Sequence, residues 1–303
     1  MTITDTKTKG QVAPLNKAKG ESQWLLIWRN FRQHKLAILG SVILLVLFAM
    51  AIFAPVLAPY DPDEMDIKYS RGAPQPPTIE HPFGTDEFGR DYMSRTIYGA
   101  QISLSVGFVS VGISLVLGIL AGVLAGYFGG HIDSTLMRIV DVLLSLPSLL
   151  VIMMVNSYLE PSIFNTMLAI GLFSWMGVAR LVRGQFLSIR EEEFVLAARC
   201  IGVGPVRMIL RHLLPSSMAV LTVAATIGIA SAILTESGLS FLGFGIQPPT
   251  SSWGSMLQSA QTFMRTSWWI SFFPGLCIAL AVLSFNFVGD GLRDSLDPKL
   301  RHR

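Results

Sequence analysis

Long apolar runs separated by short polar segments dominate the hydrophobic pattern of the chain. A helix that crosses about 30 Å of hydrocarbon needs about 20 mostly apolar residues, and six segments reach or approach that length. The predicted membrane-spanning helices cover residues 36–57, 102–127, 133–158, 162–179, 213–235 and 267–289. The pattern therefore predicts an all-α integral membrane protein with six transmembrane helices.

A further uncharged stretch, residues 237–264, has the length of a seventh span. It is interrupted by glycines and by the pair Pro248 and Pro249, which break a regular helix. Non-helical backbone at membrane depth is tolerated where protein covers it. We therefore interpret this stretch as an external or re-entrant segment rather than a span.

Composition agrees with a membrane protein. Hydrophobic residues make up 51% of the chain and charged residues 14%, against roughly 25% charged in an average soluble domain. The two cysteines, Cys200 and Cys277, are too few for a disulfide framework, and we treat both as free thiols. The lysine-rich first 20 residues resemble the start of a signal peptide, but the uncharged run at 36–57 exceeds the usual length of about 7 to 15.

Basic residues predict the orientation of the chain. Seven Lys and Arg precede residue 36, six lie in residues 180–211 and four follow Gly289, whereas residues 58–97 carry eight acidic and four basic residues. Positive loops face the cytoplasm. We expect a cytoplasmic tail at 1–35, the first transmembrane helix at 36–57, an external loop at 58–101, a five-helix core at 102–289 and a cytoplasmic tail at 290–303.

One predicted span contains a stripe of small residues. Glycines recur every four positions at 118, 122, 126 and 130, so they share one face of a helix and permit close approach of another helix. Packing within the chain is the simplest explanation. A contact with another subunit or a gating surface is the alternative.

The long basic loop at 184–215 is the most distinctive polar segment. Ser188 and Glu191 have the spacing of a capping box, Glu193 adds negative charge to a first helical turn, and Gly202 is suited to end a helix. We predict a short helix from residue 189 to 201, and a second that begins at Pro205. The loop is either solvated or a docking element.

Ionisable residues inside spans are costly and often functional. Asp141 lies three residues after Arg138, so a local ion pair at the interface is the simple interpretation, and a polar network that rearranges on opening is the alternative. Glu236 is expected at the outer end of its span. It is either solvated there or an outer-gate carboxylate that attracts the ammonium group of a peptide.

Other polar and kinking residues are weaker candidates for a pore. Pro147 lies inside a predicted span and is expected to kink it. Asn156, Asn165 and Asn286 offer hydrogen bonds to a peptide backbone, although such side chains also join helices to one another. The external loop is rich in carboxylates, and a calcium site is conceivable there, but it lacks an EF-hand pattern.

Several motifs, taken together, resemble the C-type permease subunits of dipeptide and oligopeptide ABC importers, and the resemblance extends from about residue 31 to 298. They include HPFGTDEFGRD at 81–91, RIVDVLLSLPSLL at 138–150, GLSFLGFGIQPPTSSWG at 238–254 and FNFVGDGLRDSLDP at 285–298. The resemblance implies the type I permease fold of ABC importers, with a five-helix core and one N-terminal helix. It also implies a location in the bacterial cytoplasmic membrane.

The basic loop resembles the EAA loop of these permeases, which couples them to their ATPases. Two positions depart from the motif, because Leu196 replaces its glutamate and His212 its isoleucine. The resemblance implies an ATPase-coupling role for Glu193, Ala197, Ala198, Arg199, Gly202, Leu214 and Pro215. The pore or gate candidates are Asp141, Pro147, Asn156 and Glu236.

The resemblance also implies partners: a homologous second permease, two cytoplasmic ATPases, an extracytoplasmic peptide-binding protein and membrane lipid, with no role for nucleic acid. The chain lacks the nucleotide-binding pattern G-x-x-x-x-G-K-[ST] and the common hydrolase and metal motifs. We therefore expect a non-catalytic subunit that binds no cofactor or metal, with ATP held by the partner ATPases.

Three alternatives remain open at this stage. The same architecture imports nickel chelates or glutathione in sister systems. An ion-coupled secondary transporter with Asp141 or Glu236 as its proton site belongs to a different class, and the EAA-like loop argues against it. A membrane scaffold without a pore is the third.

Overall fold

The computed structural model describes residues 23–296, and within this range every regular element is helical. One isolated bridge joins Thr85 to Asp91. The tails at 1–22 and 297–303, with most of the predicted cytoplasmic tails, lie outside the described residues. The helices are α1 (Gln23–Gln33), α2 (Lys35–Ile52), α3 (Ala54–Leu57), α4 (Tyr92–Phe128), α5 (Gly130–Leu144), α6 (Ser148–Tyr158), α7 (Ile163–Ile189), α8 (Glu193–Cys200), α9 (Pro205–Met208), the π-helical turn η1 (Ile209–Leu213), α10 (Leu214–Phe241), α11 (Trp253–Ala260), the 3₁₀ turn η2 (Gln261–Phe263) and α12 (Trp269–Leu296).

Five described helices are long and apolar enough to cross a membrane: α2, α4, α7, the continuous segment α9–η1–α10, and α12. A sixth span is broken, because α5 and α6 meet at an angle of 81°. Pro147 lies at the break and precedes α6. A proline cannot donate the backbone hydrogen bond that a continuous helix needs at this point. The six-span architecture is therefore confirmed, and the expected kink at Pro147 is a complete break.

Several helices extend beyond their predicted limits. The second span begins at Tyr92 rather than at residue 102, so the external loop ends at Asp91. The Asp91 carboxylate accepts a hydrogen bond from the backbone N–H of Ser94 over 2.7 Å and caps α4. The helix tolerates Arg95 because Asp63 pairs with it over 3.0 Å. Likewise α7 continues to Ile189, α10 to Phe241 and α12 to Leu296, while the first span stops at Ile52.

The glycine stripe packs α4 against α7 within the chain. A Cβ atom added at Gly118 would lie 2.5 Å from Val178, and one added at Gly122 would lie 2.6 Å from the backbone oxygen of Ala179. A Cβ atom added at Gly126 would lie 2.7 Å from the Cβ atom of Phe186. The intramolecular interpretation is thus confirmed for these three. Gly130 has open space around it and begins α5.

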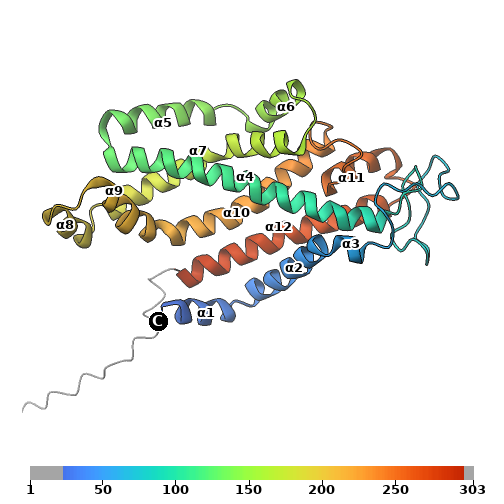
Figure 1. The fold of residues 1–303 in the computed structure, drawn as a ribbon, viewed down its shortest axis with the longest axis horizontal. Coiled ribbons are helices and arrows are strands. Elements are labelled where there is room, and N and C mark those ends of the chain that lie inside the picture. The colour runs from blue at the N-terminus through green and yellow to red at the C-terminus, as the bar shows by residue number, and fades with distance from the viewer. Residues whose placement is uncertain (1–22, 297–303) are drawn as a thin grey trace, which may run out of the picture.

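The bundle has two distinct ends (Figure 1). At one end lie α8, α9, α1 and the C-terminal turn of α12, and at the other lie α3, α11, the α6–α7 connection and the loop at 58–91. Residues 237–264 form no span: α10 ends within them, and α11 follows with its fully buried Trp253. The interpretation of this stretch as a segment that is not a span is therefore confirmed, whereas its cover by protein is partial, because Leu242 and Phe244 are exposed.

Candidate functional site

Helix α8, in the basic loop, has a sharply defined end. Gly202 has a φ of +78°, which only glycine adopts without strain. The N–H of Val203 donates to the carbonyl of Ala198 over 3.1 Å, and the N–H of Gly202 donates to that of Arg199 over 3.0 Å. This pair of bonds is a Schellman motif. The predicted helix stop at Gly202 is confirmed.

The start of α8 differs from the prediction. Helix α7 continues through Ser188, so the expected capping box with Glu191 is absent. Glu191 instead accepts a hydrogen bond from Arg190 over 2.9 Å, and α8 begins at Glu193. A short polar turn between α7 and α8 therefore replaces the first turn of the longer predicted helix.

Helix α8 is anchored to the bundle by one of its faces. Val195 and Ala198 are buried and belong to an apolar cluster that includes Phe186 of α7 and Met208 of α9. Ala197 is exposed. The two adjacent alanines therefore point about 100° apart around the helix and differ in burial. Ala198 packs inside the chain, and Ala197 faces outward.

The rest of the α8 surface is exposed and carries apolar side chains. Phe194, Leu196 and Ile201 expose 47%, 44% and 81% of their surface, with Glu193 and Arg199 also exposed beside them. Exposed apolar residues on a span are covered by lipid, but this surface lies on the loop beyond the spans. Large apolar side chains exposed outside the spans favour a protein interface.

The Leu-Pro pair of the loop lies at the entry to α10. Leu214 packs against the apolar cluster beneath α8, whereas Pro215 is exposed in the first turn of α10. The π-helical turn η1, which contains His212, immediately precedes them. A widened turn accommodates the proline, which cannot complete the regular bonding pattern.

Asp141 pairs with α7 and not with its own helix. It forms an ion pair with Arg180, and nearby Asp133 pairs with Arg183, whose Nη2 lies 2.6 Å from Oδ2. The predicted local pair with Arg138 is therefore wrong. The two cross-helix pairs tie α5 to the half of α7 that leads to α8.

Glu236 is completely buried. Its Oε1 accepts hydrogen bonds from the hydroxyl groups of Ser240 and Ser252, each over 2.7 Å. A solvated position at the membrane interface and a position in an outer vestibule are both contradicted. The carboxylate instead joins the end of α10 to the first turn of α11.

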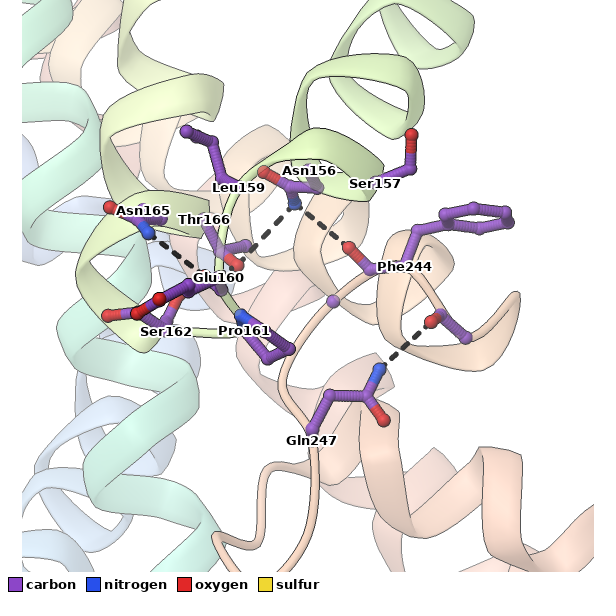
Figure 2. A pocket seen from close by; sticks show the side chains of 12 residues that line it. Asn156, Ser157, Leu159, Glu160, Pro161, Ser162, Asn165, Thr166, Phe244 and Gln247 are labelled. Carbon is purple, nitrogen blue, oxygen red and sulfur yellow. Dashed lines mark hydrogen bonds between the residues drawn. The ribbon is translucent and has the colours of Figure 1, made fainter.

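A polar pocket of about 280 Å³ opens at the end of the bundle opposite to α8 (Figure 2). Its walls come from the α6–α7 connection and from the turn that follows α10. Asn156 bridges the two walls, because its Nδ2 donates to the carbonyl of Phe244 over 2.9 Å and lies 3.5 Å from the Thr166 hydroxyl. Glu160, Asn165 and Gln247 complete the polar lining.

The sequence interpretation identified only part of this pocket. Asn156 and Asn165 meet there, whereas Asn286 donates to its own helix at Val282. Glu160 was not identified, because it lies in a short connection rather than inside a span. A carboxylate between two predicted spans at the external end was the only clue to it.

A second cavity, of about 430 Å³, lies between α4, α7 and α10. Four serine side chains line it among apolar neighbours: Ser110, Ser114, Ser174 and Ser231. Hydroxyl groups at this depth both donate and accept hydrogen bonds. The cavity therefore gives these three helices a mildly polar surface within the bundle.

Ion pairs order the loop at 58–91, which the sequence analysis predicts to be external. Arg90 pairs with Asp86 over 2.7 Å, and buried His81 lies 2.9 Å from Asp91. At its surface, hydrogen bonds from Tyr69 and then Lys68 lower the pKa of Glu80 below its ordinary value. Among the described residues no group of three or more His, Cys, Asp and Glu side chains is arranged to hold a metal ion.

The six-span bundle has the fold of an ABC importer permease. It matches the structure titled "Inward facing conformations of the MetNI methionine ABC transporter" with a TM-score of 0.57 and 20% identity, over 68% of this chain and 98% of the other. The chain belongs to the family described as binding-protein-dependent transport system inner membrane component, whose model matches residues 118–302. Residues 22–77 match the N-terminal TM domain of oligopeptide transport permease C.

Curated relatives are similar along nearly the whole chain. The dipeptide transport system permease protein DppC of Bacillus subtilis is 44% identical, over 90% of this chain and 85% of its own length. The oligopeptide permease OppC of the same organism is 38% identical (93% and 92%), and the glutathione permease GsiD of Escherichia coli is 41% identical (92% and 91%). The chain is therefore a multi-pass inner-membrane protein of a family whose members are not normally catalytic.

Proposed function

We propose that this chain is one of two permease subunits of an ATP-driven importer of dipeptides and oligopeptides. The observation that carries the proposal is the set of exposed apolar side chains on α8, which is anchored to the bundle through Val195 and Ala198, in a chain 44% identical to a dipeptide permease. Such a surface suits a groove on a cytoplasmic ATPase. ATP is bound and hydrolysed by two such partner subunits.

The orientation follows from the basic residues. Both termini and α8 lie in the cytoplasm, because residues 180–211 carry six Lys and Arg and the sequence before residue 36 carries seven. The loop at 58–91, α3 and α11 then face outward. The ordered external loop is a contact surface for an extracytoplasmic peptide-binding protein.

Coupling depends on the base of α8. Val195 and Ala198 pack on Phe186, so displacement of α8 moves the end of α7, and through the glycine stripe also α4. Shifting a two-state pore from 1:99 to 99:1 needs about 5.5 kcal/mol of differential interaction. In this proposal closure of the ATPases supplies that bias at the exposed surface of α8.

The substrate passes between this chain and a homologous second permease. The serine-lined cavity of α4, α7 and α10 is the part of this chain that suits such a path, because hydroxyl groups replace some of the water that a peptide leaves behind. The break at Pro147 bends the neighbouring span by 81°.

Uptake into proteoliposomes tests the function. The complete complex is reconstituted with ATP inside and labelled di- to pentapeptides outside, beside a matched complex whose ATPases lack the catalytic base. ATP-dependent peptide accumulation supports the proposal. Accumulation of a nickel chelate or glutathione instead, as the relative named a glutathione permease suggests, would retain the importer and reject the peptide substrate.

The same preparation distinguishes the other class. An ion-coupled secondary transporter would work without ATPase activity and would stop when an ionophore collapses the proton gradient. Uptake that persists in the catalytic-base variant and disappears with ionophore would reject the ATP-driven mechanism.

A further inference from the structure

The loop that precedes α4 is fixed to the first two turns of α12 by three neighbouring contacts. The rings of Phe83 and Phe273 stack in parallel, with their centroids 3.7 Å apart. Next along the loop, a Cβ atom added at Gly84 would lie 2.8 Å from the indole nitrogen of Trp269, so the loop backbone lies directly against that ring. Tyr92, the first residue of α4, makes the third contact.

The contact made by Tyr92 meets a gap in the hydrogen bonding of α12. Pro274 lies inside this helix and has no N–H group to donate to the carbonyl of Ile270, four positions earlier. The Tyr92 hydroxyl donates to that carbonyl oxygen over 2.6 Å. A tertiary hydrogen bond thus replaces the helical one that the proline removes.

Burial prevents water from replacing this hydrogen bond. Tyr92 is 3% exposed and Ile270 is 2% exposed, and both belong to an apolar cluster with Trp269 and with Met256 and Ala260 of α11. A buried carbonyl that loses its donor has no solvent to turn to. The Tyr92 hydroxyl is therefore a specific link between the start of α4 and the start of α12.

Helix α12 leads from this link to the opposite end of the bundle (Figure 1). It packs closely on α10, since a Cβ atom added at Gly289 would lie 3.0 Å from the side chain of Ile227. Helix α10 in turn continues directly from α9 and η1, both within the basic loop at 184–215. A displacement of α12 is thus passed to the helix that begins in the basic loop.

We infer that Tyr92 is a positioning residue that makes the loop at 58–91 and α12 move as one unit, so that a protein docked on the loop displaces α12. The inference rests on the proposed function, in which a peptide-binding protein docks on this loop. The Tyr92 hydroxyl is buried inside the chain and touches neither the peptide nor that protein. It acts by joining the docking surface to the helix that packs along α10.

ATP hydrolysis by the complete reconstituted complex tests this role. The rate is measured without binding protein and with increasing amounts of the binding protein of the same importer, saturated with trialanine. Tyr92→Phe should leave the basal rate and the half-saturating concentration of binding protein unchanged, because the docking surface is intact. The maximal stimulated rate should fall several-fold. Tyr98→Phe, which removes a hydroxyl group elsewhere on α4, should behave like wild type.

Pro274→Ala distinguishes this role from a merely structural one. The substitution restores an N–H group that donates to the Ile270 carbonyl within the helix, so the double variant Tyr92→Phe/Pro274→Ala provides that carbonyl with a donor. It still lacks the link between α4 and α12, and its stimulated rate should stay low. Pro274→Ala alone keeps the Tyr92 hydroxyl, for which the carbonyl has a second lone pair, and should keep its stimulation.

Several outcomes would overturn the inference. They are wild-type stimulation in Tyr92→Phe, recovery of stimulation in the double variant, a fall of the basal and stimulated rates together, and a wild-type complex that the binding protein does not stimulate. A raised half-saturating concentration with an unchanged maximal rate would make Tyr92 a support of the docking surface alone and would also reject the link. Peptide uptake by the wild-type complex is scored separately, so failure of this inference and failure of the proposed function are distinguishable.

Discussion

The hydroxyl group of Ser252 donates a hydrogen bond to the carboxylate of Glu236 over 2.7 Å, between residues sixteen positions apart. Ser252 also caps α11, where its Oγ accepts from the N–H of Ser255. The bond therefore links the end of α10, the turn after it and the start of α11. The same turn supplies Phe244 and Gln247 to the polar pocket. This buried contact therefore holds one wall of that pocket in place.

We expect Glu236→Ala to destabilise the protein. The substitution leaves the buried hydroxyl groups of Ser240 and Ser252 without their acceptor, at a cost of about 1–3 kcal/mol for each unsatisfied group. Glu236→Gln keeps an oxygen at the same place and should cost less. Thermal unfolding of the purified complex measures the effect, with Thr235→Ala as the neighbouring control. Equal midpoints for Glu236→Ala and Thr235→Ala would contradict this role.

We expect Gly122→Ala to weaken the packing of α4 on α7. Its Cβ atom would lie 2.6 Å from both the Ala179 backbone oxygen and the Val182 Cβ atom, so the helices must separate. Overpacking of this kind costs about 1–3 kcal/mol. Gly112→Ala on the same helix has open space around its Cβ and is the matched control. The midpoint of thermal unfolding should fall only for Gly122→Ala, and an equal response would reject the close contact.

We expect Gly202→Val to uncouple ATP hydrolysis from transport while the spans stay folded. No atom lies within 4 Å of the added Cβ, so the effect comes from the φ of +78°, which costs other residues roughly 1–2 kcal/mol. The end of α8 should unwind and transmit less motion. Transport per ATP hydrolysed should fall several-fold, whereas Gly204→Val, at a φ of −68°, should behave like wild type. Normal coupling in Gly202→Val would reject α8 as the lever.

We expect tryptophan at the two adjacent alanines to have different effects. Ala197 is exposed, so Ala197→Trp should leave the unfolding midpoint unchanged and reduce copurification of the ATPases. Ala198 is 6% exposed and packed beneath α8, so Ala198→Trp should lower the midpoint by overpacking. Thermal unfolding and affinity copurification are measured on the same samples. Identical behaviour of the two variants would contradict the orientation of α8.

We expect Tyr69→Phe to raise the pKa of Glu80. The Tyr69 hydroxyl is the main cause of its lowered pKa, and Lys68 is the second. A lowered carboxylate pKa means that the contact stabilises the loop above the ordinary value of about 4.3 and is lost as pH falls through the lowered value. Carboxyl ¹³C NMR titration, assigned with Glu80→Gln, measures the change. Lys68→Met should raise the pKa less, and an unchanged pKa in Tyr69→Phe would exclude the hydroxyl as its cause.

The sequence alone determined the features that depend on local chemistry. The number of spans follows from apolar length, because the hydrocarbon thickness fixes how many residues a helix needs. The end of α8 follows from Gly202, because a positive φ is a property of one residue and its neighbours. The break in the third span follows from Pro147, because a proline lacks the backbone N–H that a continuous helix needs. None of these depends on what lies across the bundle.

Helix limits were less predictable, because hydropathy does not indicate where a helix extends beyond the membrane. The start of α4 is set by the cap at Asp91, and Arg95 in its first turn pairs with Asp63, 32 positions earlier in the chain. This second contact depends on the folded loop and not on the local sequence. The pattern of polar and apolar residues therefore does not predict the limits of these helices.

The tertiary structure decided which candidates share a site. Glu236 and Glu160 are both carboxylates near the external end, but burial among serines makes the first a structural contact, whereas the second lines an open pocket. Ala197 and Ala198 are adjacent and chemically identical, but Ala197 is exposed and Ala198 is buried. Whether a side chain meets solvent or another helix depends on how helices pack, and that is a property of the whole bundle rather than of the residue and its neighbours.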